Sequence, residues 1–532
     1  MNATLIQVVT EKTAKQASER RPSDAVANEI KRLLQHSSHY LTGILISLAL
    51  GFVSFPIFTR AFSLSDYGTI ELIAKVLLLF TALSKMGLQQ AALRFYDGPA
   101  FVSDRASARR YYSTMFGGMV LTATFVTLIF LGGVTLAPSS LIGPTLKTLL
   151  FLVSALIVAR ALTSVLFVFV RTQEKARLYS VFTVSTKVAS VAVICLFLPW
   201  FGRSVRTFYS GTILVETAVV IVLCSMLLQR EKLTLEGFDL TLFRNGLAFG
   251  LPLIFYELAS ITLDAGDRVL VRHYLGADAM GRYSVAYGMS DYVNNLLIVP
   301  LNLALAPIYL RLWKSDGQEK TSAFLSRTLD LYLMASLGIF AVAAATSRSA
   351  VLLLASSKYR GAELLIPTLV AGLLVYTSHM FITAGLIIHN DTRTMARLLA
   401  YSALFNIGLN CFLLPRIGLW AAALVTLLSY LLCVVLLGRA SFKVLPLTID
   451  GRAAGKYVLA AAIAWYAAVH VNIESPFLNL AGRMTLTVLL YVGLLYIFDA
   501  RIRALLGGFF DRSRDPRNFE EKVLAATSES KA

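Results

Sequence analysis

LYSVFTVSTKVASVAVICLFLPW, residues 178–200, is an apolar run of membrane-spanning length with one lysine, Lys187, near its middle. About 20 helical residues cross the roughly 30 Å of hydrocarbon in a bilayer. A charge at that depth costs roughly 2.5 to 3.5 kcal/mol on insertion scales, so it faces a partner or a watered cavity rather than lipid. This stretch therefore predicts a spanning helix that brings a cation into the interior of a polytopic protein.

The rest of the chain repeats this pattern. Its 532 residues are 57% hydrophobic and 15% charged, against about 45 to 50% apolar and about 25% charged in soluble domains. The pattern predicts an all-α polytopic membrane protein with about 14 transmembrane helices. The expected spans are 41–62, 69–92, 111–136, 147–170, 178–200, 207–228, 245–265, 284–310, 328–346, 363–388, 396–415, 418–437, 456–471 and 480–498.

The placement of the basic residues predicts the orientation. Of the 49 Lys and Arg residues, 33 fall in the two tails and one set of alternate loops, and 12 fall in the opposite loops. The positive-inside rule then places both termini in the cytoplasm, which an even number of spans allows. The net charge of +18 therefore reflects membrane topology, and no nucleic-acid partner is expected.

The two ends of the chain are polar. Residues 1–38 lack the short apolar core of a secretory signal. Within them Val26, Ile30 and Leu33 share one helical face, which predicts either a short amphipathic helix on the membrane surface or a frayed tail. Residues 499–532 are expected to form a solvated cytoplasmic tail.

Two parts of the chain read almost alike about 216 positions apart. Cys195-Leu-Phe-Leu-Pro-Trp-Phe-Gly202 matches Cys411-Phe-Leu-Leu-Pro-Arg-Ile-Gly418, and a weaker echo relates the stretch ending at Gly68 to the one ending at Gly281. Six spans separate equivalent positions, which predicts two parallel six-helix bundles around a central cavity. The expected domains are 39–230 and 244–437, followed by two additional helices in 455–498.

Several short motifs follow one another between residues 38 and 440. They are Phe55-Pro56 with Thr59-Arg60, Leu64-Ser65-Asp66-Tyr67-Gly68, Met86-Gly87-Leu88-Gln89-Gln90, Arg94-Phe95-Tyr96, the loop 171–179, Gly250-Leu251-Pro252, Asp267-Arg268, Gly281-Arg282-Tyr283-Ser284, Asn406-Ile407-Gly408-Leu409-Asn410 and the stretch 418–430. With these motifs in this order, the chain resembles Wzx-type flippases, the lipid-linked oligosaccharide exporters of the multidrug/oligosaccharidyl-lipid/polysaccharide (MOP) superfamily.

The resemblance implies a specific activity. Such proteins move undecaprenyl-pyrophosphate-linked oligosaccharide units across the bacterial inner membrane by alternating access, for the biosynthesis of O-antigen, capsule or exopolysaccharide. The implied partners are the polyprenyl-pyrophosphate-linked sugar, membrane lipids, H⁺ or Na⁺ as coupling ion, and a polysaccharide polymerase or export complex. Neither a cofactor nor a metal is expected, because the four cysteines lie in apolar runs without metal-ligand spacing.

Four basic residues inside spans of the first half are the candidate binding site for the anionic headgroup: Lys75, Lys85, Arg160 and Lys187. Cations lining a cavity lower the cost of holding a pyrophosphate away from water. Two alternatives stay open. Lys75 can pair with Glu71, four residues earlier on the same helix, and Lys85 can extend to the membrane interface.

Acidic residues inside spans are the candidates for ion coupling: Glu216, Glu257, Asp264 and Asp291. Carboxylates in such a site can bind and release H⁺ or Na⁺, and each charge that crosses the membrane gains about 2.3 kcal/mol per 100 mV. The alternative is a fixed ion pair with Arg160 or Lys187 across the cavity.

Two other transport functions and one enzymatic function are the alternatives. A lipid II flippase has a similar pyrophosphate lipid as its substrate, whereas a multidrug-extrusion antiporter favours an acidic cavity rather than a basic one. A membrane glycosyltransferase or polymerase is a third class, but the short loops and the lack of a Gly-rich phosphate loop or HExxH motif favour transport over an enzyme.

Overall fold

The computed structural model describes residues 22–98, 101, 104–139, 142–231, 237–499 and 503, and these residues form helices and connecting turns without a strand. Twelve helical segments are long and apolar enough to cross a membrane. The helices of the first half are α2 (Pro22–Ala61), α3 (Leu64–Lys85), α4 (Leu88–Arg94), α6 (Arg105–Leu136), α7 (Pro144–Thr172), α8 (Ala176–Phe201) and α9 (Val205–Glu231).

The second half begins with the longest helix, α10 (Leu240–Ala350), which turns back twice. Gly276 (φ 85°) and Gly317 (φ 77°) have left-handed backbone conformations that only glycine adopts readily, and they divide α10 into segments 240–275, 277–316 and 318–350. The remaining elements are η2 (Val351–Ala355), η3 (Ser357–Tyr359), η4 (Ala362–Leu364), α11 (Ile366–Thr377), α12 (His379–Ile382), α13 (Ala384–Ile388), α14 (Thr392–Ile417), α15 (Leu419–Ser441), α16 (Gly451–Val469) and α17 (Pro476–Phe498).

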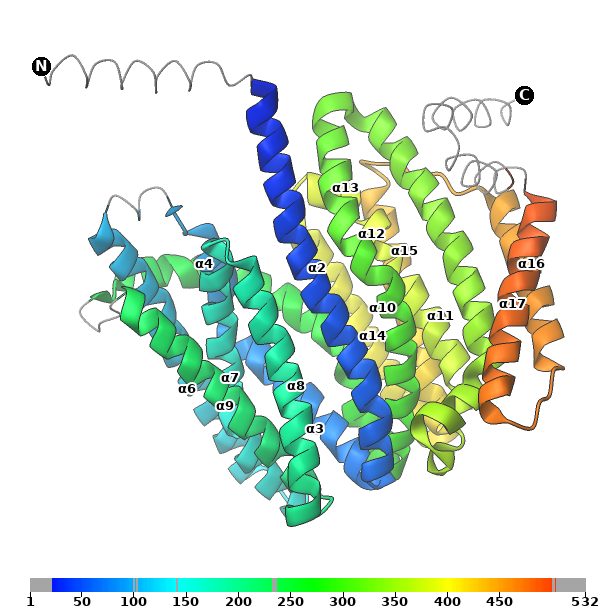
Figure 1. Ribbon diagram of the computed structural model, residues 1–532, viewed down its shortest axis with the longest axis horizontal. Coiled ribbons are helices and arrows are strands. Elements are labelled where there is room, and N and C mark those ends of the chain that lie inside the picture. The colour runs from blue at the N-terminus through cyan, green and yellow to red at the C-terminus, as the bar shows by residue number, and fades with distance from the viewer. Residues whose placement is uncertain are drawn as a thin grey trace, which may run out of the picture.

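The predicted fold class is confirmed. Figure 1 shows α4 to α9 on one side, α11 to α15 on the other, α2 between them, and α16 and α17 at the outer edge. The two outer helices pack on the third segment of α10 through Ala341, Ala460, Ala464 and Tyr491. We call the face where α2 begins and α17 ends the terminal face, and the opposite face the distal face.

The duplication predicted from the sequence is visible in the backbone. Gly202 and Gly418 both have positive φ, at 82° and 65°, and each ends a helix three residues after a proline. Gly68 and Gly281, the other matched pair, touch each other near the distal face: a Cβ on Gly68 would lie 2.6 Å from the Gly281 nitrogen. Equivalent glycines of the two halves therefore meet where the halves join.

The ends of the chain are described only in part. Helix α2 already begins at Pro22 and continues without a break into the first span, so residues 24–34 form no separate helix. The amphipathic face predicted for Val26, Ile30 and Leu33, and most of the predicted tail 499–532, lie outside the described side chains.

Candidate functional site

A small charged cavity lies between the two halves. It has a volume of about 330 Å³ and is formed by α2, α3 and α8 of the first half and by the first two segments of α10. Its charged lining residues are Glu71, Lys75, Lys187, Asp264, Arg268 and Asp291. The cavity thus brings together three cations and three carboxylates from helices far apart in the sequence.

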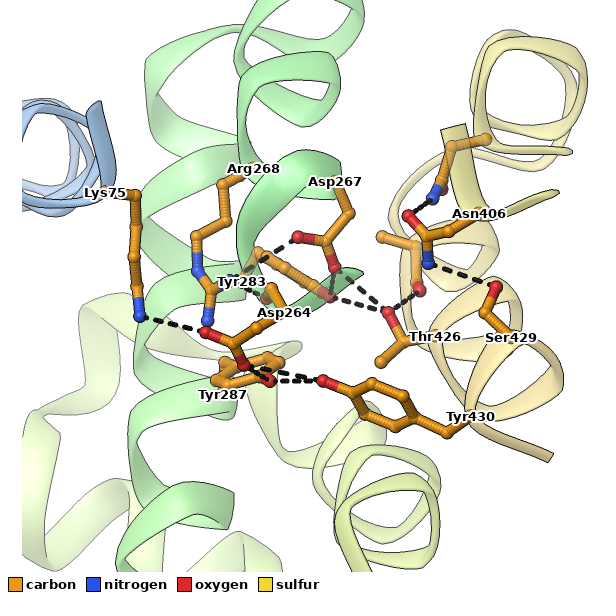
Figure 2. Close-up of polar contacts among 12 residues, drawn as sticks. Lys75, Asp264, Asp267, Arg268, Tyr283, Tyr287, Asn406, Thr426, Ser429 and Tyr430 are labelled. Atoms are coloured by element: carbon orange, nitrogen blue, oxygen red, sulfur yellow. Dashed lines mark hydrogen bonds and ion pairs between the residues drawn. The ribbon is translucent and has the colours of Figure 1, made fainter. Parts of the chain in front are cut away.

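Lys75 of α3 reaches across the cavity to the second half. Its Nζ lies 3.6 Å from Oδ2 of Asp264 on α10 (Figure 2). The alternative pair within α3, between Lys75 and Glu71, is not the contact that the structure shows. A cation of the first half is therefore held by an acid of the second half.

Lys187 on α8 differs from Lys75. Its side chain is exposed to the cavity, and none of the described residues places a carboxylate within 4 Å of its Nζ. Glu71, which also lines the cavity, attracts it electrostatically without forming an ion pair. Among the three cavity cations, Lys187 is therefore the one whose charge is least neutralised by an ion pair.

Asp264 is held in place by several neighbours. It accepts hydrogen bonds from the hydroxyl groups of Tyr287 and, at 3.4 Å, Tyr430, and these two hydroxyls lie 2.9 Å apart. The guanidinium of Arg268 lies 3.9 Å above the Tyr287 ring and donates to the backbone oxygen of Asp264. The acid side of the cavity is thus fixed before any ligand binds.

Behind this wall a buried polar network crosses the second half (Figure 2). Asp267 accepts hydrogen bonds from Tyr283 and from Thr426, the latter at 3.0 Å, and its Oδ1 lies 3.5 Å from Arg268. On α14, the Asn406 amide donates to Ser429 of α15 at 3.2 Å. These bonds join α10, α14 and α15 into one rigid body behind Arg268.

The halves also contact each other near the terminal face. Lys85, at the end of α3, pairs with Glu257 of α10 at 2.7 Å. Farther along the same seam, the backbones of Gly87 and Gly250 lie in contact, since a Cβ on Gly250 would lie only 2.6 Å from the Gly87 carbonyl carbon. With Gly68 and Gly281 in contact at the distal end, the α3–α10 seam is closed on both sides of the cavity.

Arg160 and Glu216 form an ion pair inside the first half. Two nitrogens of the Arg160 guanidinium on α7 donate hydrogen bonds to the two carboxylate oxygens of Glu216 on α9, at 2.8 and 2.9 Å. Neither residue lines the charged cavity. The pair joins two helices of one bundle, and both side chains are partly buried.

The predicted site residues therefore divide into two groups. Lys75, Lys187, Asp264 and Asp291 line the cavity, whereas Lys85, Arg160, Glu216 and Glu257 are paired outside it. The alternative of a fixed ion pair with Arg160 or Lys187 across the cavity is not what the structure shows. Asp264 and Glu257 of the second half pair with Lys75 and Lys85, and Arg160 pairs with Glu216 inside the first half.

Sequence reasoning missed Arg268 as a cavity residue. The predicted span 245–265 ended too early, because the first segment of α10 continues to residue 275 and keeps Arg268 inside the helix. Arg268 therefore adds a cation from the second half to those predicted in spans of the first half. Arg268 is only 2% exposed, and its contacts with Asp267 and Tyr287 explain how a charge is kept there.

An apolar groove adjoins the charged cavity. Leu48, Phe55 and Tyr292 line both the cavity and a hollow of about 490 Å³ between α2 and α10. That hollow shares Ala343 and Thr346 with a further apolar hollow of about 660 Å³, which is walled on its other side by α17. Charged and apolar surfaces therefore lie next to each other along one path.

The sequence and the fold match known proteins. The profile of a family described as "Polysaccharide biosynthesis protein" matches residues 33–313, just over half of the chain. No curated protein sequence gives a match.

Solved structures of transporters share the fold at low identity. The lipid II flippase MurJ in an inward closed conformation matches with a TM-score of 0.67 and 14% identity, over 86% of this chain and 98% of that chain. A multidrug resistance MATE family transporter of the MOP superfamily, in an inward-facing conformation, matches with a TM-score of 0.59 and 13% identity, over 75% and 94%. A Vibrio cholerae MATE transporter gives 0.52 and 13%, over 78% and 97%.

Proposed function

The chain belongs to the polysaccharide biosynthesis protein family, and from this premise we propose that it flips polyprenyl-pyrophosphate-linked oligosaccharides across the bacterial inner membrane. The lipid carrier in this proposal is undecaprenyl pyrophosphate, as the resemblance to Wzx-type flippases implies. The terminal face is cytoplasmic and the distal face periplasmic. The flipped units serve the synthesis of a surface polysaccharide.

The observation that carries this proposal is the joined charged and apolar surface between the halves. A lipid-linked sugar has an anionic pyrophosphate and a long apolar tail. Lys187 and Lys75 offer cations to the pyrophosphate, and the groove from Phe55 to α17 offers an apolar path to the tail. Arginine and lysine at partly buried sites are the residues that bind phosphates most strongly.

The volume of the cavity indicates when the sugar binds. At about 330 Å³ it lies at the lower end of ligand pockets, so an oligosaccharide enters only when the halves part. The structure, closed at Gly87–Gly250 and at Gly68–Gly281, fits the closed stage between two open states of an alternating-access cycle. Opening at one face exposes the lysines to that side of the membrane.

Ion coupling follows from the charge balance of the cavity. Three cations face three carboxylates, so a pyrophosphate that enters competes with Asp264 for Lys75. Binding of H⁺ or Na⁺ at Asp264 or Asp291 removes this competition and keeps the loaded cavity near neutrality. Transport therefore depends on the ion gradient through these two acids.

The test is transport in vesicles that contain the purified protein and a fluorescent lipid-linked oligosaccharide. Lys187→Gln is expected to lower the rate by about tenfold or more, the effect of losing about 1.4 kcal/mol of binding. Lys147→Gln is the matched control, because Lys147 donates to the Thr135 carbonyl oxygen on another part of the first half, away from the cavity. Equal rates for the two variants would refute the cavity as the headgroup site.

A lipid II flippase is the second candidate function, favoured by the fold shared with MurJ. Native mass spectrometry of the gently purified protein distinguishes the two, because the sugars on a retained lipid differ in mass. A multidrug antiporter is disfavoured by the exposed charge of Lys187, which repels organic cations. A glycosyltransferase would change the mass of the lipid-linked sugar, whereas a flippase only moves it.

A further inference from the structure

A second group of cations gathers at the distal face, away from the charged cavity. Arg60 ends α2, and Arg203 lies in the turn between α8 and α9. Both line a hollow of about 440 Å³ whose other walls are Ala61, Cys195, Leu198 and Pro199. Lys358 of the second half lies beside it, with its Nζ 3.4 Å from the Arg60 backbone oxygen.

These cations lack acidic partners in the part of the chain that the structure describes. No carboxylate lies within 4 Å of the charged groups of Arg60, Arg203 or Lys358 among those residues. The acids on neighbouring turns are engaged locally, since Asp66 accepts from Ser63 and Glu363 from the Gly361 amide. Burial and the nearby charge of Arg203 lower the pKa of Lys358, as expected for cations held close together.

The backbone fixes the positions of two of the three cations. Arg60 donates to the carbonyl oxygens of Pro56 and Leu353, and Lys358 donates to those of Arg60 and Phe62. Neutral carbonyl groups orient these side chains without cancelling their charge. The cluster is thus arranged to present positive charge to a ligand.

The position of the hollow relative to the membrane indicates which kind of anion it binds. Trp200 and Phe201, beside Pro199 in its wall, are 80% and 69% exposed. Exposed aromatic residues at the end of a spanning helix mark the membrane interface, where lipid headgroups lie. Basic residues are also depleted from loops on the periplasmic side of membrane proteins, the side proposed for this face. A cluster of three basic residues at one hollow therefore differs from the composition expected of that face.

We propose that Arg60, Arg203 and Lys358 form a second anion site, at the distal face, that binds the phosphate or diphosphate of a lipid headgroup. Two lipids have this chemistry: the polyprenyl diphosphate cargo, which then leaves the protein by way of this site, and the anionic phospholipid of the surrounding leaflet. The choice of the cargo rests on the proposed function, whereas the binding of a lipid phosphate does not. Two guanidinium groups and one ammonium supply the charge-assisted hydrogen bonds that a diphosphate accepts.

Cys195 is a native reporter, because it lines the hollow and is a free thiol. The full chain, with Cys224, Cys411 and Cys433 replaced by alanine, is placed in phosphatidylcholine nanodiscs. Negatively and positively charged methanethiosulfonate reagents are then compared for their rate of reaction with Cys195. The negative reagent is expected to react about tenfold faster, since a local potential of about one kT favours one charge and opposes the other.

Ligand binding is read from protection of the same thiol. Geranylgeranyl diphosphate, but not geranylgeraniol, is expected to slow the labelling of Cys195. Arg203→Gln and Lys358→Gln are expected to remove both the charge preference and the protection, and Arg203→Lys to keep part of each. Arg206→Gln is the matched control, because Arg206 is an exposed arginine one turn away that does not line the hollow. Size-exclusion profiles confirm that each variant is folded.

The outcomes separate this site from the transport proposal. Protection by geranylgeranyl diphosphate that survives in Lys187→Gln supports the second site even if transport fails. Protection only in phosphatidylglycerol nanodiscs also supports the site and assigns it to phospholipid. The proposal is overturned if Cys195 does not react in the unliganded protein, if it shows no charge preference, or if protection is unchanged in Arg203→Gln and Lys358→Gln.

Discussion

The contact between Gly87 and Gly250 gives the sharpest test of the closed terminal face. A Cβ on Gly250 would lie 2.6 Å from the carbonyl carbon and 2.7 Å from the Cα and oxygen of Gly87. These atoms belong to the backbone, so no side chain can rotate away. Because ordinary contact begins near 3.4 Å, Gly250→Ala forces the two backbones apart by about 0.8 Å.

The cost of that separation falls on one conformation only. Inserting a methyl group into a close-packed contact typically costs about 1 to 3 kcal/mol. Since 1.4 kcal/mol is a factor of ten, the ratio of closed to open protein at the terminal face is expected to fall by roughly 5- to 150-fold. Gly250 lies inside a helix, where alanine is favoured over glycine by about 1 kcal/mol, so overall stability is maintained.

Electron–electron double resonance measures this shift directly. Spin labels at Arg177 and Lys320, on a chain without native cysteines, report the distance between the halves, because both side chains are exposed at the terminal face. Gly250→Ala is expected to move the distance distribution toward the longer, open separation. Transport is expected to slow because the cycle passes through the closed state.

Gly246→Ala is the matched control, one turn earlier on the same helix. Its Cβ would meet only side-chain atoms: the flexible end of Leu88 lies nearest, at 3.3 Å, and Ala91 Cβ is at an ordinary contact distance of 3.6 Å. The distance distribution of this variant is expected to match that of the wild type. If Gly250→Ala also matched the wild type, then the glycine contact would not hold the terminal face closed, and the reasoning would be wrong.

Three further predictions concern charged groups. Arg483→Ala is expected to destabilise the protein by about 3 kcal/mol, seen as a lower Tm and faster proteolysis of the 470–475 turn, because Arg483 donates to Val471, Ala345, Val469 and Asn472 at 2.9 to 3.0 Å. Arg416→Ala is the control, because Arg416 loses only its contacts with Phe412 of the same helix. Glu216→Gln is expected to lower the free energy of unfolding by about 2 to 4 kcal/mol, because it leaves Arg160 unpaired. The double variant Arg160→Gln with Glu216→Gln is expected to recover most of that stability in thermal unfolding. It should also still transport; loss of transport in a folded double variant would return Arg160 to the headgroup site. Asp264→Asn removes the carboxylate that pairs with Lys75, so it is expected to tighten diphosphate binding several-fold. It is also expected to weaken the dependence of transport on the ion gradient, measured in vesicles with and without the gradient. An unchanged gradient dependence would exclude Asp264 from coupling.

The sequence predicts the helices well because membrane insertion constrains composition strongly. Each apolar run needs about 20 residues, which leaves little freedom in counting spans. The errors arise where protein rather than lipid surrounds a helix. At Arg268 the helix continues past a charge that hydropathy assigns to a loop, because Asp267 and Tyr287 compensate that charge inside the bundle.

The candidate site is less predictable for a related reason. Lys75 has an acid four residues away, yet it pairs with Asp264, 189 positions later in the chain. Lys85 likewise pairs with Glu257 across the seam. Periodicity identifies residues that share a face of one helix, but it does not show which helix that face meets. Lys187 and Asp291 could be selected from their position near the middle of a predicted span. That Arg160 lies outside the cavity, in contrast, can be seen only from the packing of α7 against α9.

The two halves have the same backbone arrangement but contribute opposite charges to the seam between them. This difference in charge bears on how transport would proceed. Equivalent glycines, Gly68 and Gly281, meet at the seam, so the backbone arrangement keeps the symmetry of the duplication. Among the described residues, in contrast, both ion pairs across the α3–α10 seam join a lysine of the first half to an acid of the second half. Under the proposed function, a pyrophosphate would take the place of Asp264 on Lys75. Because one anion would replace another, binding of such a headgroup would loosen the Lys75–Asp264 contact across the seam, and its departure would let that pair form again.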